Sequence, residues 1–518
     1  MLAAFLLFLL GVQGDAFVGF DSRFVLFARE MLRHGPGAFP TTYGMPYPDY
    51  PATSTLLIYL ASLPLGRVTE FTAWLPTAVA AAICVGVTFR LVAPFSRTWA
   101  LVSVAMLLLS VTFVSETRAV SLDLMVAATG MLAFYVAFQA ERYDLPGLLL
   151  RLLPLLWIGF ALRGPLGLVV PAGMVCSQLL LDRRWKPLFV FGASALALLI
   201  LCAVGLIALA RAAGGETFVA DVLRMQVIGR LDGSAGSSDA LYYFRSSLGN
   251  YALAFPLALP ALALLWRRRG EPAFRLVAGC ALAALVVMAG LSVPEAKKAR
   301  YIIAMAPLAA IVAGYPFMVA GSRLAQVLRG LLQVIWLALP ILLLAGLWLA
   351  WKRYPQELAA LGWRLPACIV VLAALLVFAA LRWRRPAALA LGAALALWAS
   401  YILVFEPVEH RLYDSQAFSR ELARQLDAQP APLALYGMAP DARAIKLMVN
   451  LDRDLQPQFL DRPEQLAALH GPHYLMIQAR DAQRIAASLP EAAQQLFEGR
   501  FDNDAYRLLR LPGAGANP

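Results

Sequence analysis

The sequence predicts a polytopic α-helical membrane protein that ends in a small α/β domain. Of its 518 residues, 61% are hydrophobic and only 15% are charged, and the mean hydropathy is +0.68. Apolar runs follow one another up to about residue 404, after which charged and polar residues become frequent. Together these observations predict about thirteen transmembrane helices in residues 1–405 and a separate domain in residues 406–518.

The first apolar segment, MLAAFLLFLLGVQGDA, is short for a membrane span and lacks the basic start of a signal peptide. We therefore expect an uncleaved first helix. Further apolar runs predict helices at about 72–92, 98–115, 119–139, 147–162, 165–181, 187–210, 247–266, 272–291, 301–320, 330–351, 365–381 and 387–404.

Short basic clusters between these runs set the predicted orientation. Clusters such as Arg183 with Arg184, and Arg267 with Arg268, fall on one side if every run crosses once, and that side is the cytoplasm. The loop at 14–55 and everything after Phe405 are then outside. Because the basic charge belongs to these loops, the net charge of +12 does not indicate nucleic acid as a partner. The cysteines fall in apolar runs and form no metal-binding or disulfide pattern.

The loop at 14–55 carries Asp21 and Asp49 among aromatic residues and prolines. Helical spacing places Phe24, Phe27 and Met31 on one face, which predicts an amphipathic helix lying on the bilayer surface. We interpret the loop as the floor of a site at the membrane–water boundary.

Several basic residues fall on the outer side, where the positive-inside rule disfavours them. They are Arg118, Arg163, Arg230, Arg245, Lys297, Lys298 and Arg300. Headgroup anchoring explains some of them, and a positive pocket for a phosphate group is the alternative. The run Lys297 to Tyr301, at the start of a predicted helix, is the strongest candidate for that pocket. The outer loop at 211–245 contains GSAGSSD and predicts a mobile flap.

The C-terminal domain shows mixed periodicity. We predict strands at 432–438, 445–451, 473–479 and 506–511, and helices at 416–429 and 481–497. About 110 residues are enough for an α/β domain with a core of its own.

Five short motifs carry a resemblance to a known family. They are DSR with AREM in residues 21–31, GMPYPDYP at 44–51, LDL at 122–124, LRGP at 162–165, and KKARYIIAMAP at 297–307. With the predicted helices and the outer tail, the chain resembles the type C (GT-C) glycosyltransferases of the aminoarabinose-transferase and protein-mannosyltransferase superfamily. The resemblance runs nearly end to end.

The resemblance implies a membrane glycosyltransferase of the bacterial inner membrane, with its C-terminal domain in the periplasm. Such enzymes move a sugar from a polyprenyl-phosphate donor, such as one on undecaprenyl phosphate, to a lipid A, envelope-glycan or protein acceptor. Direct displacement of the phosphate inverts the sugar. The sugar and the acceptor stay open. A transporter or flippase of an amphipathic anion is the alternative function, and an inactive relative whose outer domain binds a partner is a third.

The resemblance also implies roles for individual residues. Asp21 is the candidate general base and Asp123 the second catalytic carboxylate, since a carboxylate can take the proton of an attacking hydroxyl; helix capping is the alternative for both. The candidate phosphate-binding residues are Lys297, Lys298, Arg300, Arg163 and Tyr301. The candidate substrate-binding residues are Arg23, Asp49, Tyr50, Arg118, Arg230 and Tyr242. The resemblance implies no definite cofactor, and a divalent metal ion at Asp49 stays open as an alternative to a metal-free site.

Overall fold

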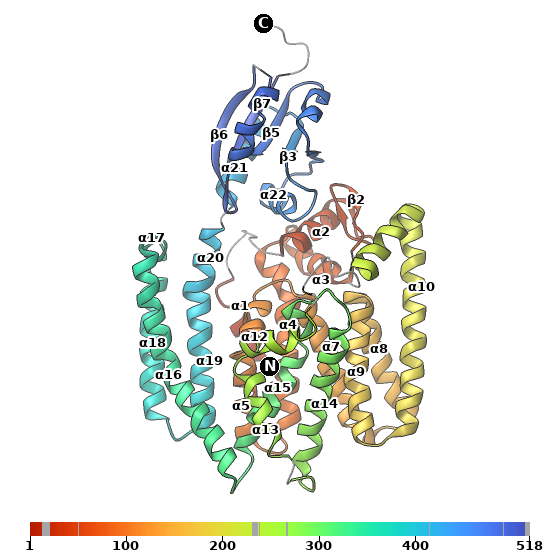
Figure 1. Ribbon diagram of the computed structural model, residues 1–518, viewed down its shortest axis with the longest axis vertical. Helices are drawn as coiled ribbons and strands as arrows, with labels where there is room; N and C mark the ends of the chain where they lie inside the picture. Colours follow the sequence, from red (N-terminus) through yellow and green to blue (C-terminus); the bar gives the residue numbers. More distant parts are fainter. Residues whose placement is uncertain are drawn as a thin grey trace.

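A helical bundle and a small sheet domain stacked on one end of it form the molecule (Figure 1). The computed structural model describes residues 1–12, 21–49, 51–229, 237, 239–265, 268–413, 415–490 and 492–512, without the side chains of Asp21, Val227 and Ala487. Helix α20 (Glu406–Leu412) leads from the bundle to the sheet domain, which we call the outer domain.

Each predicted apolar run coincides with a helix or a pair of helices. The bundle comprises α1 (Leu2–Leu9), α4 (Glu70–Val92), α5 (Arg97–Leu108), α6 (Val111–Thr117), α7 (Leu122–Phe138), α8 (Leu145–Arg163), α9 (Pro165–Leu181), α10 (Trp185–Leu223), α12 (Tyr242–Asn250), α13 (Ala254–Leu262), α14 (Pro272–Ser292), α15 (Met305–Gly314), α16 (Arg323–Arg353), α17 (Pro355–Ala359), α18 (Arg364–Leu381) and α19 (Pro386–Ser400). Helix α10 extends into the predicted flap, with a kink at Gly214 and Gly215.

The lengths of the helices bear on the predicted number of thirteen spans. Among the described residues, seven helices are long and apolar enough to cross a membrane, or eight if α5 and α6, bent by 70°, count as one span. Helices such as α1 and α15, with 8 and 10 residues, are shorter than the roughly 20 residues that an upright span needs. The count of thirteen is therefore not confirmed, although the class of fold is.

Local chemistry fixes where the helices begin and turn. Ser121 caps α7 by accepting a hydrogen bond from the Leu124 amide at 3.2 Å. Gly164 joins α8 to α9 with a φ of 60°, which favours glycine, and a Cβ on Gly159 or Gly167 would collide with the carbonyl of the other. The two helices therefore approach closely, and the turn between them has one conformation.

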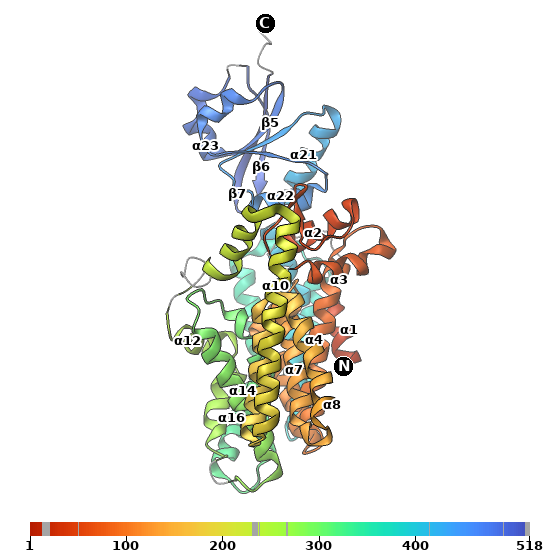
Figure 2. The same cartoon turned by 90° about the vertical axis from the view of Figure 1, so that its right-hand side faces the viewer.

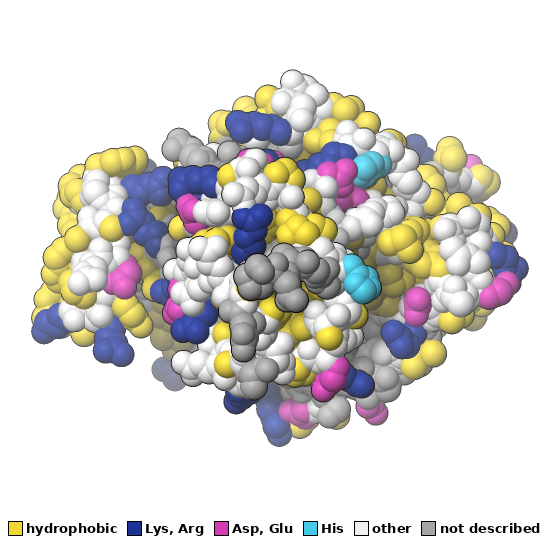
Figure 3. All heavy atoms as spheres, turned by 90° about the horizontal axis from the view of Figure 1, so that it is seen from above, with side chains coloured by type: hydrophobic (Ala, Val, Ile, Leu, Met, Phe, Trp, Pro, Cys, Tyr) yellow, Lys and Arg dark blue, Asp and Glu magenta, His cyan; other side chains and the backbone are white. Residues whose placement is uncertain are grey.

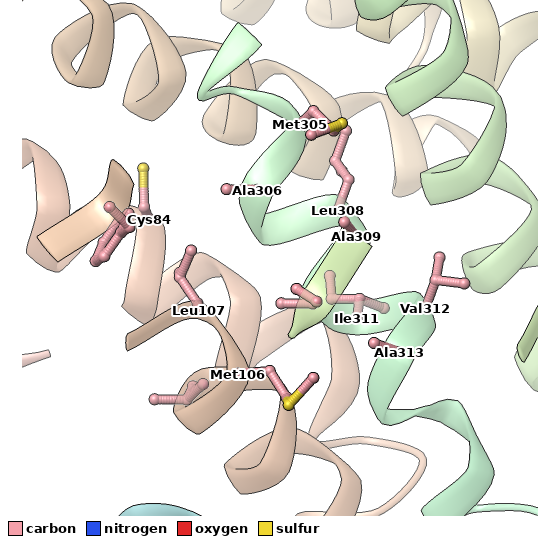
Figure 4. Packing of buried hydrophobic residues seen from close by; sticks show 14 of the residues in the cluster. Cys84, Met106, Leu107, Met305, Ala306, Leu308, Ala309, Ile311, Val312 and Ala313 are labelled. Carbon is pink, nitrogen blue, oxygen red and sulfur yellow. The ribbon is translucent and has the colours of Figure 1, made fainter. Parts of the chain in front are cut away.

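The centre of the bundle is packed with apolar side chains of α4, α5 and α15. Figure 4 shows Cys84, Met106, Leu107 and Leu308 among the residues that meet there, all fully or almost fully buried. Since lipid tails are as apolar as these side chains, close van der Waals packing, rather than exclusion from water, holds such helices together.

The outer domain is a five-stranded mixed sheet with helices packed beside it. Its strands are β3 (Leu433–Tyr436), β4 (Gln458–Leu460), β5 (His473–Gln478), β6 (Gln494–Phe501) and β7 (Asp504–Leu511), in the order β4-β3-β5-β7-β6. β3 runs parallel to β4 and β5, whereas β7 is antiparallel to β5 and β6. The helices are α21 (Gln416–Ala428), α22 (Arg443–Leu451) and α23 (Ala479–Arg484). The predicted strands at 432–438, 473–479 and 506–511 and the helix at 416–429 are confirmed.

Two predictions for the outer domain were wrong. Residues 445–451, predicted as a strand, lie in α22, because their apolar side chains are buried at helical spacing. A short apolar run does not by itself distinguish a buried strand from a buried helix. The predicted helix at 481–497 is limited to α23 and a short turn, after which β6 pairs with β7 through a reversal at Asp502 and Asn503.

Helix α2 (Asp21–His34) is not the bilayer-surface helix that the sequence predicted. Phe24, Phe27 and Met31 are at most 3% exposed, and the helix packs against α3 (Thr53–Ser62) and α22. Figures 1 and 2 both show it between the outer domain and the bundle. Its apolar face therefore binds protein rather than lipid, because the outer domain covers the first loop.

A buried ion pair ties α1, α6 and α20 together. Arg118 donates through Nε to Glu406 at 3.0 Å and through Nη2 at 2.5 Å, and its Nη1 reaches the carbonyls of Phe8 and Leu10, both at 2.8 Å. The Arg118 side chain is 0% exposed. Removing one partner of such a pair leaves the other charge buried and unopposed.

We expect Arg118→Ala to lower the free energy of unfolding by about 3 kcal/mol or more, because Glu406 keeps its charge in a buried place. Thermal unfolding of the purified protein in detergent measures the effect. Arg411→Ala, which removes an exposed arginine bonded to the Ala360 carbonyl on the same side of the bundle, is the control. Equal melting temperatures for the two variants would contradict this account.

Candidate functional site

A polar cavity of about 280 Å³ lies where the bundle meets the outer domain. The start of α2, the start of α7, the end of α8 and the segment before α15 each contribute to its wall. Its charged and polar lining residues are Arg23, Tyr47, Asp49, Glu116, Ser121, Asp123, Arg163, Gln226, Lys298, Arg300, Tyr301 and Asp441. Segments far apart in the sequence therefore supply one site.

Asp123 is held between two guanidinium groups. One of its carboxylate oxygens pairs with Arg163 Nη1, and the other lies 3.4 Å from Arg300 Nε. The side chains of Asp123 and Arg163 are both 7% exposed, so this network is shielded from bulk water. Ser121, not Asp123, caps α7, so helix capping does not explain the carboxylate.

The position of Arg163 follows from its place at the end of α8. The Gly164 turn and the close α8–α9 approach fix the backbone there. The Arg163 guanidinium also lies 4.7 Å from the ring centre of Tyr301, a favourable cation–π contact. Tyr301 thus restrains the cation that faces Asp123.

Only part of the basic run at 297–301 faces the cavity. Lys298, Arg300 and Tyr301 line the cavity, whereas Lys297 is 3% exposed and is not among the lining residues. The Lys297 carbonyl accepts a hydrogen bond from the Ser237 amide at 3.3 Å. This bond anchors the segment, in which Lys298 and Arg300 face the cavity and Lys297 is buried away from it.

The first loop supplies a second ion pair. Arg23 Nη2 lies 3.2 Å from Asp49 Oδ2, and the guanidinium is 5.3 Å from the ring centre of Phe24 and 5.8 Å from that of Tyr47. Burial lowers the pKa of the Arg23 guanidinium, but the nearby Asp49 carboxylate raises it, and the net effect is a raised pKa. Burial also raises the pKa of the Tyr47 hydroxyl. Both groups therefore keep their protons near neutral pH.

The sequence missed several residues that the structure adds to the cavity. Glu116 accepts a hydrogen bond from Ser121 Oγ, and Asp441 enters the wall from the loop between β3 and α22. Glu116 stands at the end of an apolar run, as Asp123 stands at the start of one, so the same sequence pattern could have identified Glu116 as a site residue. Asp441 carries no comparable pattern, because nothing in the tail predicts contact with the bundle.

Other predicted site residues are not brought into the cavity. Arg118 pairs with Glu406, donates to two carbonyls and is not among the described residues that line the cavity, so its substrate contact stays a prediction. Tyr242 begins α12 and packs against Tyr243, and it is not among the lining residues. Tyr50 and Arg230 lie outside the described residues. Asp21 is the first residue of α2, two positions before Arg23, and its side chain is not described.

The surroundings of Asp49 do not suit a metal ion. Its carboxylate faces the Arg23 cation at 3.2 Å, and no histidine is among the residues that line the cavity. A guanidinium beside a carboxylate opposes the approach of a second cation. We therefore derive no chemistry from a metal at Asp49.

Among the described residues, the charges that line the cavity balance in number but not in position. Arg23, Arg163, Lys298 and Arg300 oppose Asp49, Glu116, Asp123 and Asp441. Arg163, Lys298 and Arg300 come from the end of α8 and the segment before α15, on the bundle side, whereas Asp441 enters from the outer domain. The cavity can therefore bind an anion with three cations while a carboxylate lies beside it.

Comparisons with known proteins agree with this architecture. The family model of the dolichyl-phosphate-mannose-protein mannosyltransferases matches residues 15–222. The crystal structure of ArnT from Cupriavidus metallidurans bound to undecaprenyl phosphate is similar over 100% of this chain and 98% of that chain, with a TM-score of 0.75 and 16% identity. The apo structure of the same protein gives a TM-score of 0.74 and 15% identity, with the same coverage.

The outer domain contributes Asp441 to the wall of the cavity only while it stays docked on α2, so its docking can be tested. We expect Arg29→Ala to weaken docking, because Arg29 bonds to the Val449 carbonyl and lies 3.2 Å from Asp452. Losing about 1.5–3 kcal/mol of charge-assisted bonding should speed protease cleavage between bundle and outer domain by about tenfold or more. Arg420→Ala, an exposed change within α21, should leave the cleavage rate unaltered.

Proposed function

We propose that this chain, whose fold is that of the type C glycosyltransferases, is an integral membrane glycosyltransferase that uses a polyprenyl-phosphate sugar as donor. The observation that carries the proposal is the cavity in which Asp123 lies between Arg163 and Arg300. Buried ionisable residues in membrane-embedded chains commonly mark substrate pathways. Unlike the Arg118–Glu406 pair, this network lines the polar cavity. The bound lipid phosphate of the similar ArnT structure supports the choice of donor.

The donor phosphate fits the cationic side of the cavity. Arg163, Lys298 and Arg300 come from two neighbouring segments and converge on one volume. Guanidinium and ammonium groups form strong, charge-assisted hydrogen bonds with phosphate. As the carbon–oxygen bond of the donor breaks, these cations stabilise the phosphate that leaves, so no acid has to protonate it.

The acceptor hydroxyl needs a base. In a direct displacement, its oxygen attacks the anomeric carbon, the bond to the phosphate oxygen breaks, and the hydroxyl proton passes to a carboxylate. Asp21, at the start of α2, is the first candidate and Asp123 the second. An arriving phosphate competes with Asp123 for Arg163 and Arg300, and this exchange frees a carboxylate oxygen for the proton.

We expect the acceptor to enter from the outer side, where Asp441 and the first loop contribute to the wall of the cavity. Lipid A, another envelope glycan and a protein are the acceptor classes that such an approach allows. The basic loops at the opposite end of the bundle support our proposal that this side faces the periplasm and that the bundle lies in the inner membrane of a bacterium.

We expect Asp123→Asn to abolish most sugar transfer while retaining donor binding. The variant tests Asp123 as the base, since the structure describes its side chain: loss of a general base costs about 10²–10⁴-fold in rate, whereas removal of a competing carboxylate leaves the cations free for phosphate. Transfer in proteoliposomes and binding of undecaprenyl phosphate are the two measurements. Weak binding together with weak transfer would instead give Asp123 a structural role.

The product distinguishes the proposal from its alternative. A covalently glycosylated acceptor formed in proteoliposomes supports a transferase. Movement of the lipid across the bilayer with no covalent product would favour a transporter or flippase.

We expect Lys298→Gln to weaken the binding of undecaprenyl phosphate by about tenfold or more, since a charge-assisted hydrogen bond contributes about 1.5–3 kcal/mol. Lys352→Gln, which removes a lysine that rests on Trp348 near the end of α16, is the matched control and should bind as the native chain does. Equal weakening in both variants would show a general charge effect and no phosphate pocket.

A further inference from the structure

A second group of ligand-type side chains lies at the junction of α2 with the outer domain. Donor atoms of Glu30, His34 and Asp454 all lie within 4.8 Å of one another. Glu30 and His34 are four residues apart on α2, so they share one face of the helix. Asp454 comes from the outer domain, just after α22. None of the three is among the residues that line the polar cavity.

The distances suit a transition-metal ion. His34 Nε2 lies 3.3 Å from Asp454 Oδ2. Two ligands of one tetrahedral zinc ion, each bonded at about 2.0–2.2 Å, are roughly 3.3–3.6 Å apart. The His34 and Asp454 side chains are 49% and 55% exposed, so an ion can reach them.

The buried ligand is already oriented. Glu30 is only 3% exposed, and its Oε2 accepts hydrogen bonds from Thr41 Oγ1 and from the Gly44 amide, both at 3.2 Å. Groups that bond to a ligand in this way fix its direction and strengthen metal binding. The β1–β2 hairpin (Thr41–Thr42 and Met45–Pro46) of the first loop therefore supports the position of the carboxylate.

The outer-domain ligand is also held in place. Asp452 follows α22 in a left-handed conformation, and it pairs with Arg33 at 2.9 Å and with Arg29 at 3.2 Å. These contacts fix the backbone two residues before Asp454. Both sides of the cluster are thus in position before an ion binds, so little ordering remains when it does.

We propose that Glu30, His34 and Asp454 bind a divalent transition-metal ion of the zinc class that fastens the outer domain onto α2. Imidazole with two carboxylates favours zinc-like ions over magnesium or calcium, which take oxygen ligands. Two converging carboxylates repel each other, and a divalent ion offsets both charges. Because α2 carries Arg23 and the outer domain carries Asp441, the ion fixes two walls of the polar cavity relative to each other.

Zinc titration of the full-length protein, purified in detergent and freed of metal with a chelator, tests the site. We expect one zinc ion per chain by competition with a chromogenic chelator. His34→Ala and Asp454→Asn each remove an exposed ligand and should weaken binding by at least about tenfold. His470→Ala removes another exposed histidine of the outer domain and should bind zinc as the native chain does.

Hydrogen exchange supplies a readout that does not depend on activity. Zinc should slow exchange of the α22 amides in the native chain and in His470→Ala, but not in His34→Ala. Undiminished zinc affinity in His34→Ala, or the absence of stoichiometric binding to the native chain, overturns the site. Stoichiometric binding that leaves α22 exchange unchanged overturns the fastening of the outer domain.

Discussion

The contact of Asp123 with Arg163 and Arg300 is the interaction around which the cavity is built. Opposite charges near the membrane interior attract more strongly than in water, but a charge without a partner is correspondingly costly there. Packing of the bundle therefore has to bring together the start of α7, the end of α8 and the segment before α15. The glycine turn at Gly164 and the close approach of α8 and α9 meet part of that requirement.

Docking of the outer domain completes the site. Figure 3 views this end of the molecule, where acidic, basic and histidine side chains are mixed in the middle and hydrophobic side chains lie toward the left and right margins. The polar middle is the outer domain that covers α2, and the margins are bundle helices that extend beyond it. Arg29, Arg33 and Asp452 provide polar contacts at the junction, and Phe24 and Phe27 provide apolar ones. The cavity is thus enclosed by two bodies of different composition.

Much of the fold could be predicted because the membrane imposes a strong pattern. Apolar runs marked the bundle helices other than the short α17, but the number of spans could not be fixed, since packed helices such as α15 need not cross the whole bilayer. The site followed from charges at the ends of apolar runs, and Asp123, Arg163, Lys298 and Arg300 do meet. Arg118 shows the same pattern and pairs with Glu406 instead, because a sequence does not reveal partners 288 residues away. The contribution of Asp441 depends on domain docking, for which the tail contains no local indication.

The contact between α2 and α22 has a consequence for biogenesis. Arg29 bonds to a carbonyl 420 positions later in the chain, so α2 leaves the ribosome long before its partner exists. Until then its apolar face and its arginines lack their final surroundings, and contacts of such long sequence separation form late. The N-terminal loop must wait, accessible to chaperones and proteases, until the last fifth of the chain has been synthesised and has folded.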